Sequence, residues 1–353
     1  MKSQTTPIRV LIAEDSPTYR ELLVTILQNA PDLQVIGTAR NGIEAVRLAK
    51  RLKPDVITMD VYMPEMDGFE ATRQIMTEIP CPVVIISAST AKDQRDLTFN
   101  ALRAGALSVL EKPTLQDLPE VYEALVTQVR LMSEVKVVRH WSKPTVSLES
   151  ELPATAKPPT LVQNGRSKIQ LVAIASSTGG PGVLAEILSK LPGDFPVPIL
   201  IVQHITPGFG AGLADWLNQQ TPLQVRLARH ADEPKPGQVL IAPDGAHMVL
   251  NSMGLIGMTN APSLHGLRPA ADYLFHSVAQ VYGATALGII LTGMGSDGAA
   301  GLQAMRRAAA HTIAQDKETC VVFGMPAVAI ELGAAEQILP AQRIAAAIMA
   351  LIE

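Results

Sequence analysis

The chain has 353 residues, and at roughly 150 residues per domain this length predicts two domains. Charged residues make up 18% and hydrophobic residues 47%, which excludes a disordered chain and is typical of α/β domains with aliphatic cores. The net charge of -4 argues against nucleic acid as the main partner, and two cysteines, Cys81 and Cys320, cannot cross-link a chain of this size.

The apolar segments are too short to cross a membrane. The longest, such as Val83–Ala88 and Ala284–Leu291, fall well short of the roughly 20 residues that a bilayer requires. The N-terminus has one early Lys2 and no long apolar run, so it does not resemble a secretory signal. We therefore expect a cytoplasmic protein without membrane insertion.

Short apolar runs alternate with amphipathic stretches over residues 1–132. Helical patterns lie at Arg20–Leu27 and Ile43–Lys50, and Asn41 is placed to cap the second of these helices. The alternation predicts a doubly wound, flavodoxin-like domain with a parallel sheet. Its five expected strands are Val10–Ala13, Val35–Ala39, Val56–Met59, Val83–Ile86 and Ser108–Leu110.

The periodic pattern stops over residues 133–168, which we interpret as a linker. This stretch holds four prolines, five serines and a net charge of +3, a composition typical of semi-extended tethers. The strand–helix alternation resumes over residues 169–353 and predicts a second α/β domain with a mostly parallel sheet. Within it, Met248–Asn251 and Leu255–Met258 have the pattern of a hairpin.

The second domain also contains apolar runs typical of strands and amphipathic stretches typical of helices. The expected strands are Leu171–Ala175, Pro198–Val202, Val239–Ala242 and Ala286–Leu291. The expected helices are Gly182–Leu191, Gly208–Gln219, Ala270–Tyr282 and Ala299–Ala310.

Polar side chains follow the strands of the first domain, at the edge where open parallel sheets bind ligands. Glu14, Asp15 and Asp60 would repel one another there unless they hold a hard divalent cation, most readily Mg²⁺. Ser87 and Lys112 suit an incoming phosphoryl group, which Asp60 could accept as an aspartyl phosphate. Single carboxylates often only cap helices or stay solvated, but five polar residues at successive strand ends favour a site.

These residues stand in motifs that resemble the response-regulator receiver domain over the whole first half: EDS at 14–16, MDVYMPEMDG at 59–68, Ser87, and KP at 112–113. The resemblance implies phosphorylation of Asp60 by a partner histidine kinase. One departure is Val109, which stands where many receivers carry an aromatic switch residue. The implied Mg²⁺ ligands are Glu14, Asp15, Asp60 and the backbone carbonyl of Tyr62, and the implied phosphoryl contacts are Ser87 and Lys112.

In the second domain, the turn SSTGGPG at 176–182 connects a strand to a helix. Such a turn can expose a hydroxyl beside a helix N-terminus, whose free N–H groups favour developing negative charge, as an oxyanion hole requires. A phosphate-binding loop is the competing interpretation, but the turn lacks the Walker lysine and the dinucleotide glycine spacing. Cys320 as an alternative nucleophile is less favoured, because a lone cysteine at a strand–loop junction is usually a small buried apolar residue.

A nucleophilic serine needs a base and a carboxylate that orients the base. His204 follows the second strand of this domain and Asp297 follows the strand Ala286–Leu291, so both are expected at the same sheet edge as the serine. The alternatives are a hydrogen-bonded loop histidine and an aspartate that only caps the following helix. Four glycines between Gly293 and Gly301 predict a sharp turn or a close backbone approach.

Five segments resemble the catalytic domain of chemotaxis protein-glutamate methylesterases, the CheB family, from about Ile169 to the end of the chain. They are SSTGGP, QHITPGF, APDGAHM, LTGMGSDGAAG and CVVFGMP. With a receiver in front and a tether between, the whole chain resembles this family. Two departures are Ala175-Ser176, where the family usually has Gly-Ala, and Leu267, where a histidine is common.

The resemblance implies that Ser177 rather than Ser176 is the nucleophile, that His204 is the general base and that Asp297 orients it. The backbone around Thr178 and Met294 is implied near the oxyanion. The implied activity is a phosphorylation-activated hydrolysis of glutamate γ-methyl esters on chemoreceptors, with deamidation of specific receptor glutamines, giving sensory adaptation. Mg²⁺ in the receiver is the implied cofactor, and the esterase reaction needs none.

Two other functions are compatible with a receiver at the N-terminus. One is a receptor-binding adaptor without catalysis, because a triad can be present but misaligned. The other is a DNA-binding output domain, but residues 169–353 hold 9 basic and 13 acidic residues and no helix with a basic face. This charge balance weighs against DNA binding.

Overall fold

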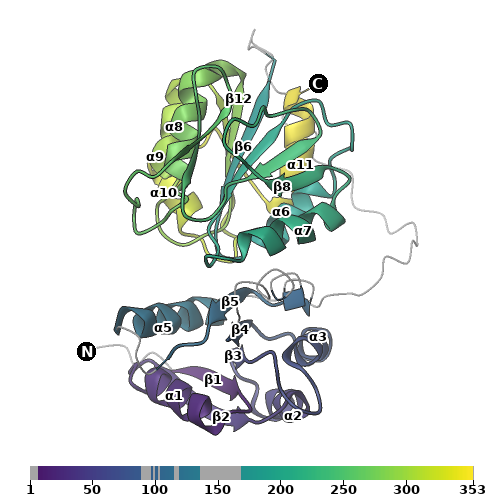
Figure 1. Cartoon of the computed structure of the whole chain (residues 1–353), viewed down its shortest axis with the longest axis vertical. Helices are drawn as coiled ribbons and strands as arrows, with labels where there is room; N and C mark the ends of the chain where they lie inside the picture. The colour runs from purple at the N-terminus through teal and green to yellow at the C-terminus, as the bar shows by residue number, and fades with distance from the viewer. Residues whose placement is uncertain are drawn as a thin grey trace.

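The computed structural model describes residues 7–88, 97, 100–101, 104–114, 119–135 and 168–352. Residues 136–167, which make up most of the predicted linker, lie outside the described residues. Two α/β bodies are present, one built from each predicted domain (Figure 1). In the described part of the chain, no helix is both long enough and apolar enough to cross a bilayer.

The N-terminal body is a parallel sheet with the strand order β2-β1-β3-β4-β5, which is the flavodoxin-like order. The predicted doubly wound fold is therefore confirmed. Its strands are β1 (Ile8–Ala13), β2 (Leu33–Ala39), β3 (Val56–Met59), β4 (Val83–Ser87) and β5 (Ser108–Glu111). The helices given by the described residues are α1 (Pro17–Gln28), α2 (Gly42–Leu52), α3 (Gly68–Glu78) and α5 (Pro119–Ser133).

Helices cover both faces of this sheet because successive side chains of a strand point to opposite sides. Leu11 on β1 packs with residues of α2 and α3, whereas its neighbour Ile12 packs with residues of α1 and α5. As predicted, Asn41 caps α2, since its side-chain oxygen accepts a hydrogen bond from the backbone N–H of Glu44 at 2.8 Å.

The C-terminal body is a larger parallel sheet with the strand order β14-β13-β12-β6-β7-β9-β8. Its strands are β6 (Leu171–Ser176), β7 (Ile199–Gln203), β8 (Gln224–Leu227), β9 (Gln238–Ile241), β12 (Ala286–Ile290), β13 (His311–Gln315) and β14 (Gln337–Leu339). Its helices are α6 (Gly180–Leu188), α7 (Gly210–Gln220), α8 (Ala271–Val281), the 3-10 turn η1 (Gly283–Thr285), α9 (Ala299–Arg307), α10 (Met325–Glu331) and α11 (Ala341–Ile352).

The predicted hairpin is also present, as the antiparallel pair β10 (His247–Leu250) and β11 (Ile256–Thr259). Six elements of the C-terminal body were not predicted, namely β8, β13, β14, α10, α11 and the 3-10 turn η1. Among these strands, β8 and β14 lie at the two edges of the sheet and are only partly buried, so they lack a continuous apolar run. By contrast, α11 carries Ile344, Ile348 and Ile352 at four-residue spacing, a helical signal that the sequence does contain.

The centre of the larger sheet brings three strand ends together. β6 pairs with β12 on one side and with β7 on the other, and Ser176 is paired with Gln203 in this register. The loops after β6, β7 and β12 therefore meet at one edge of the sheet. All three strands are buried along their full length, so these loops start from fixed positions.

The packing of α8 against α9 depends on Phe275, a fully buried residue of α8 that lies against Gly301 of α9. We expect Phe275→Ala to lower the free energy of unfolding by about 3–5 kcal/mol, because it removes a large buried side chain and leaves a cavity. Chemical denaturation of the whole chain, followed by circular dichroism, measures the change. The control is Ile338→Ala at a half-exposed position, and equal losses in the two variants would contradict this role for Phe275.

Candidate functional site

The residues at the three central strand ends are tied to one another through their backbones. The N–H of His204, just after β7, donates to the carbonyl of Ser176 at 2.9 Å. The N–H of Ser177, just after β6, donates to the carbonyl of Thr292, just after β12, at 3.0 Å. Parallel pairing thus continues past the strands and holds the three loops side by side.

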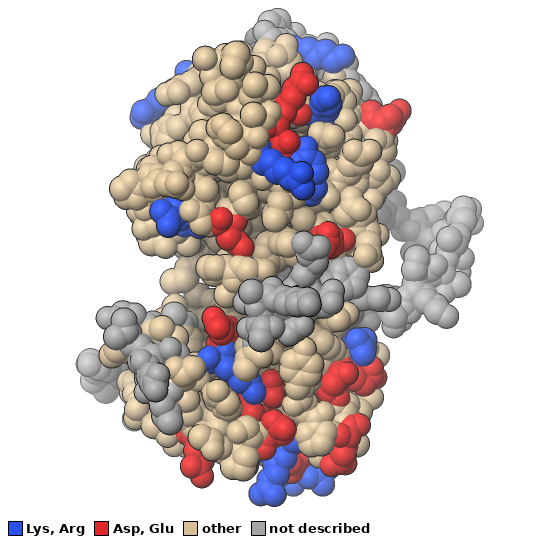
Figure 2. Space-filling model, in the orientation of Figure 1, with Lys and Arg blue, Asp and Glu red and all other residues tan. Residues whose placement is uncertain are grey.

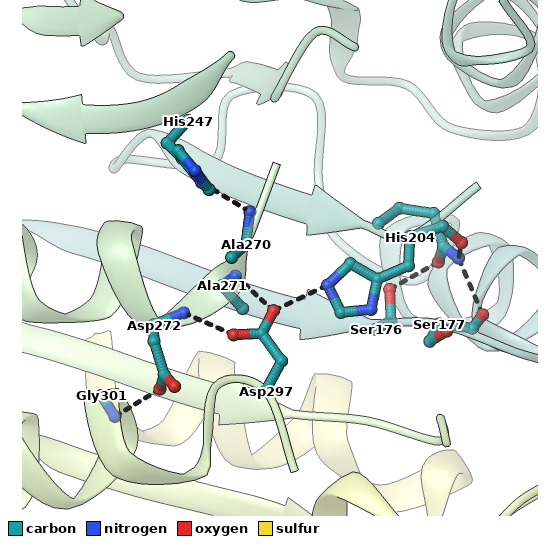
Figure 3. Close-up of polar contacts among 10 residues, drawn as sticks. Ser176, Ser177, His204, His247, Ala270, Ala271, Asp272, Asp297 and Gly301 are labelled. Atoms are coloured by element: carbon teal, nitrogen blue, oxygen red, sulfur yellow. Dashed lines mark hydrogen bonds and ion pairs between the residues drawn. The ribbon is translucent and has the colours of Figure 1, made fainter. Parts of the chain in front are cut away.

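His204 and Asp297 form a direct pair in this edge. The Nε2 atom of His204 lies 2.8 Å from Oδ2 of Asp297, and both side chains are buried (Figure 3). An ionised carboxylate can only accept, so Nε2 carries the proton and Nδ1 keeps its lone pair when the ring is neutral. The pair therefore presents Nδ1 as a base, and this nitrogen lies on the side away from Asp297.

Asp297 is fixed by the beginning of α8. Its Oδ2 accepts the N–H of Ala271 at 2.6 Å and its Oδ1 accepts the N–H of Asp272 at 3.1 Å. Burial raises the pKa of Asp297, but the hydrogen bonds from His204 and from these two amides outweigh it and lower that pKa overall. The carboxylate thus stays ionised in the protein interior. The capping alternative needs correcting: Asp297 caps α8, and not α9, which follows it in sequence.

The two adjacent serines have different environments. Ser176 is fully buried and its hydroxyl donates to Oε1 of Gln203 at 2.6 Å. Ser177 is partly exposed and lines the same cavity as His204. Among the described residues, no hydrogen bond joins the Ser177 hydroxyl to His204. The structure therefore brings the predicted nucleophile, Ser177, and the predicted base, His204, into one cavity without a hydrogen bond between them.

Gln203 is a site residue that the sequence analysis missed. Its Nε2 donates to the carbonyl of Ser177 at 2.7 Å and to the carbonyl of His204 at 2.8 Å. Together with the hydroxyl of Ser176, these contacts use both donors and the acceptor of the buried amide. Gln203 thereby braces the two loops against each other. Its position directly before His204 at the end of a buried strand was the available signal.

The loop after β12 lies against Ser177. A Cβ atom at Gly293 would lie 2.7 Å from Cβ of Ser177, so only glycine allows this approach. Met294 follows it and is 46% exposed, and Thr178 lines the cavity together with Ser177. Cys320 is not favoured as a nucleophile, because burial raises the pKa of its thiol to about 12 and keeps the thiol protonated.

The N-terminal body covers this cavity, which has a volume of 230 Å³. The hydroxyl of Thr206 donates to the carbonyl of Val109 on β5 at 2.9 Å. Phe209 is 1% exposed and packs into the apolar cluster that contains Val109. From the N-terminal body the cavity is lined by Leu107, Ser108, Val109, Leu110 and Gln128, and from the C-terminal body by Ser177, Thr178, Pro181, Gln203, His204, Ile205, Thr206 and Leu267.

A second polar site lies at the edge of the N-terminal sheet. Glu14, Asp15 and Asp60 bring ligand oxygens within 4.8 Å of one another. Lys112 pairs with Glu14 and with Asp60, each at 2.9 Å. Burial raises the pKa of both Glu14 and Asp60, although Lys112 opposes the change. Burial alone would lower the pKa of Lys112, but its hydrogen bonds to these carboxylates raise it overall.

The donor set of this second site fits a hard divalent cation, because three carboxylates converge and two of them are desolvated. Among the residues that the structure describes, the buried hydroxyl of Ser87, at the end of the neighbouring strand β4, has no hydrogen-bond partner. A phosphoryl oxygen would satisfy such a group. Tyr62 follows Asp60 by two residues, and its side chain is exposed. The use of its backbone carbonyl as a metal ligand stays a prediction.

Lys and Arg side chains are scattered among Asp and Glu on the face drawn in Figure 2, and they form no continuous basic surface there. This distribution does not favour a DNA-binding function for the second domain.

Both halves match known families. Residues 172–348 match the family described as CheB methylesterase, and residues 10–124 match the response regulator receiver domain. The second half is therefore a methylesterase-type domain and not a DNA-binding output domain.

Relatives match over nearly the full length. The protein named protein-glutamate methylesterase/protein-glutamine glutaminase 1 of Syntrophus aciditrophicus is 47% identical, and the match covers 98% of each chain. A similarly named protein of Myxococcus xanthus is 45% identical over 94% of this chain and 93% of its own. The crystal structure of the CheB methylesterase catalytic domain of Thermotoga maritima is 40% identical, with a TM-score of 0.51, and covers 52% of this chain and 100% of its own.

The two sheets, the paired histidine and aspartate beside an accessible serine, and these full-length matches agree with one another. This chain belongs to the CheB methylesterase family and carries a response-regulator receiver domain in front of its methylesterase domain.

Proposed function

We propose that this chain hydrolyses glutamate γ-methyl esters of chemoreceptors, deamidates specific receptor glutamines, and is activated by phosphorylation of its receiver domain. The observation that carries the proposal is the cavity in which Ser177 and His204 meet, with Asp297 behind the histidine. The full-length relatives that bear both activities in their names support it. The partners are then the receptors and a histidine kinase, and the site of action is the cytoplasm.

The reaction follows from the order of these groups. Nδ1 of His204 takes the proton of the Ser177 hydroxyl, and the alkoxide attacks the ester carbonyl. Backbone N–H groups around Thr178 and Met294 hold the resulting oxyanion. His204 returns the proton to the departing methoxide, and methanol leaves. Water, activated by the same histidine, hydrolyses the acyl-enzyme to the γ-carboxylate, and a glutamine substrate releases ammonia by the same steps.

Asp297 keeps His204 in the required tautomer throughout. Its ionised carboxylate holds the Nε2 proton and stabilises the imidazolium that forms when Nδ1 is protonated. Gln203 supports the same step, because its contacts to the carbonyls of Ser177 and His204 limit the distance between nucleophile and base. The missing hydrogen bond between Ser177 and His204 requires a small adjustment of one side chain before reaction.

The receiver restricts this reaction when it is not phosphorylated. Residues of β5 and Gln128 on α5 form one wall of the catalytic cavity, so a receptor segment cannot reach Ser177 while this wall is in place. The wall is held by the Thr206–Val109 hydrogen bond and by the apolar packing of Phe209, Ile205 and Val321 against the receiver. Phosphorylation of Asp60 would release it through Lys112, which follows β5 and loses its pairing with the Asp60 carboxylate when that group becomes an acyl phosphate.

Mg²⁺ would be held by Glu14, Asp15, Asp60 and the carbonyl of Tyr62. When bound, it would neutralise charge on the transferred phosphoryl group. Asp60 provides the accepting oxygen, and Lys112 and Ser87 contact the phosphoryl oxygens.

The serine assignment is tested by comparing two adjacent substitutions. We expect Ser177→Ala to reduce methanol release from methylated receptor membranes by a factor on the order of 10³ or more, because it removes the nucleophile. Ser176→Ala loses one buried hydrogen bond and should cost at most roughly tenfold. If Ser176→Ala has the larger effect, the assignment is wrong. If the wild type and Ser177→Ala release methanol alike, the assignment is also wrong, whereas a wild-type chain that releases none would favour the adaptor alternative.

The receiver contact predicts a gain of activity. Thr206→Val removes the hydroxyl that donates to Val109 and keeps the shape of the side chain, so we expect several-fold higher activity of the unphosphorylated full chain. The same substitution in a fragment starting at Ile169 should change nothing, since the receiver is absent. Methanol release with and without acetyl phosphate measures both. A full chain that is as active as the fragment before phosphorylation would refute the restriction.

Phosphoryl transfer is expected to require Asp60 and Mg²⁺. Incubation with ³²P-labelled acetyl phosphate should label the wild-type chain, and Asp60→Asn or chelation with EDTA should abolish the label. Asp55→Asn is the control, because Asp55 accepts the backbone N–H of Arg9 at the opposite end of the strands. Labelling of Asp60→Asn at the wild-type level would place the acceptor elsewhere.

A further inference from the structure

His247 is a fully buried histidine that the proposed reaction does not use. It begins β10 and stands in the segment APDGAHM, one of the family-like segments without an assigned role. Its ring makes contacts with both nitrogens: Nδ1 lies 3.0 Å from the backbone N of Ala270, and Nε2 lies 3.2 Å from the carbonyl oxygen of Pro262. One ring thus connects the two ends of the segment 262–270.

These two partners fix the tautomer of the ring. The backbone N–H of Ala270 can only donate, so Nδ1 of His247 must be the unprotonated nitrogen. The proton of the neutral ring then lies on Nε2 and is donated to the carbonyl of Pro262. The ring also stacks on Tyr273 of α8, with a centroid distance of 4.0 Å and an interplanar angle of 28°. His247 is therefore held on both edges and on one face.

The segment between these ends is a compact loop. Leu264 and Leu267 exchange two backbone hydrogen bonds, at 3.1 and 2.9 Å. The residues between them, His265 and Gly266, both have positive φ, as a two-residue turn of this kind requires. Leu267 lines the catalytic cavity, whereas Leu264 and His265 line a neighbouring cavity of 610 Å³. The loop is thus a wall of the catalytic cavity.

The far end of the loop leads directly into the support of Asp297. The N–H of Ala270 donates to His247, and the next two N–H groups, those of Ala271 and Asp272, donate to the Asp297 carboxylate (Figure 3). Three successive amides at the start of α8 are therefore held by two buried acceptors. A shift of Ala270 would move the amides that orient Asp297, and through Asp297 it would move His204.

We propose that His247 is a positioning residue with two separable effects. Its Nε2 contact to Pro262 holds the 262–270 loop as the substrate-facing wall that carries Leu267. Its Nδ1 contact to Ala270 holds the start of α8 under Asp297. This inference rests on the proposed esterase function, because it assigns the first contact to substrate binding and the second to the rate of the chemical step.

Three substitutions separate the two contacts. His247→Asn places an amide oxygen near the position of Nδ1, so it can keep the contact to Ala270 and lose the contact to Pro262. His247→Gln reaches the position of Nε2, so it can keep the contact to Pro262 and lose the contact to Ala270. His247→Phe keeps the stacking on Tyr273 and loses both hydrogen bonds. The matched control is His230→Gln at an exposed position outside the site.

The kinetics of phosphorylated full-length chain on methylated receptor membranes give the test. We expect KM to rise several-fold in His247→Asn with kcat nearly unchanged, and kcat to fall roughly tenfold in His247→Gln with KM nearly unchanged, since the first variant loses only the contact to the Pro262 carbonyl and the second loses only the contact to the buried N–H of Ala270. His247→Phe should show both changes and His230→Gln neither. Equal changes in kcat and KM for the Asn and Gln variants, or wild-type kinetics in both, would overturn the proposal.

A spectroscopic readout is independent of activity. In the full chain labelled with ¹⁵N-histidine, the signals absent from His247→Asn belong to His247, and at neutral pH they should have the pattern of a ring protonated on Nε2 alone. A ring protonated on Nδ1 would overturn the inference even if the enzyme is active. An inactive wild-type chain with the expected ring pattern would instead count against the proposed function.

Discussion

The catalytic domain depends on keeping one carboxylate, that of Asp297, ionised in the protein interior. Burying an unpaired charge is costly, so this group needs several donors at fixed positions. His204 supplies one and the start of α8 supplies two. The position of α8 is in turn set by its packing on α9 and on β10, and by the His247–Ala270 contact. The nitrogen of His204 that carries the proton is thus determined by contacts that extend from Asp297 through the start of α8 to α9 and β10.

The two polar sites of the molecule shift the pKa of a buried carboxylate in opposite directions. Asp60 and Asp297 are both buried, yet the pKa of Asp60 is raised and that of Asp297 is lowered. Asp60 has other carboxylates nearby and one lysine shared with Glu14, so burial prevails. Asp297 has three donors directed at its two oxygens. The first arrangement favours adding a positive or electrophilic group, and the second favours a stable anion that orients a histidine.

One short segment carries both the proposed general base and the contact with the receiver. His204 begins it, Thr206 binds the carbonyl of Val109, and Phe209 packs into the core cluster of the receiver. On the receiver side, β5 carries Val109 and leads three residues later to Lys112 at the acidic site. Little more than one strand and one loop separate the proposed phosphorylation site from the proposed base. Val109, which stands where many receivers have an aromatic residue, contacts the C-terminal body directly through its backbone carbonyl and its apolar side chain.

The sequence by itself determined the two α/β domains, most of their strands, and the residues that gather at the strand ends, because buried parallel strands have a strong apolar signal and their loops must carry the polar groups. Its separated motifs also led, through the family resemblance, to the prediction that Ser177, His204 and Asp297 are the catalytic residues. Edge strands such as β14 are only partly buried and lack a continuous apolar run. Only the tertiary structure decided that Asp297 caps α8 rather than the helix after it, that Gln203 braces two loops, and that His247 connects Pro262 with Ala270. These contacts join residues distant in the chain, and their hydrogen-bond geometry depends on how the strands and helices pack.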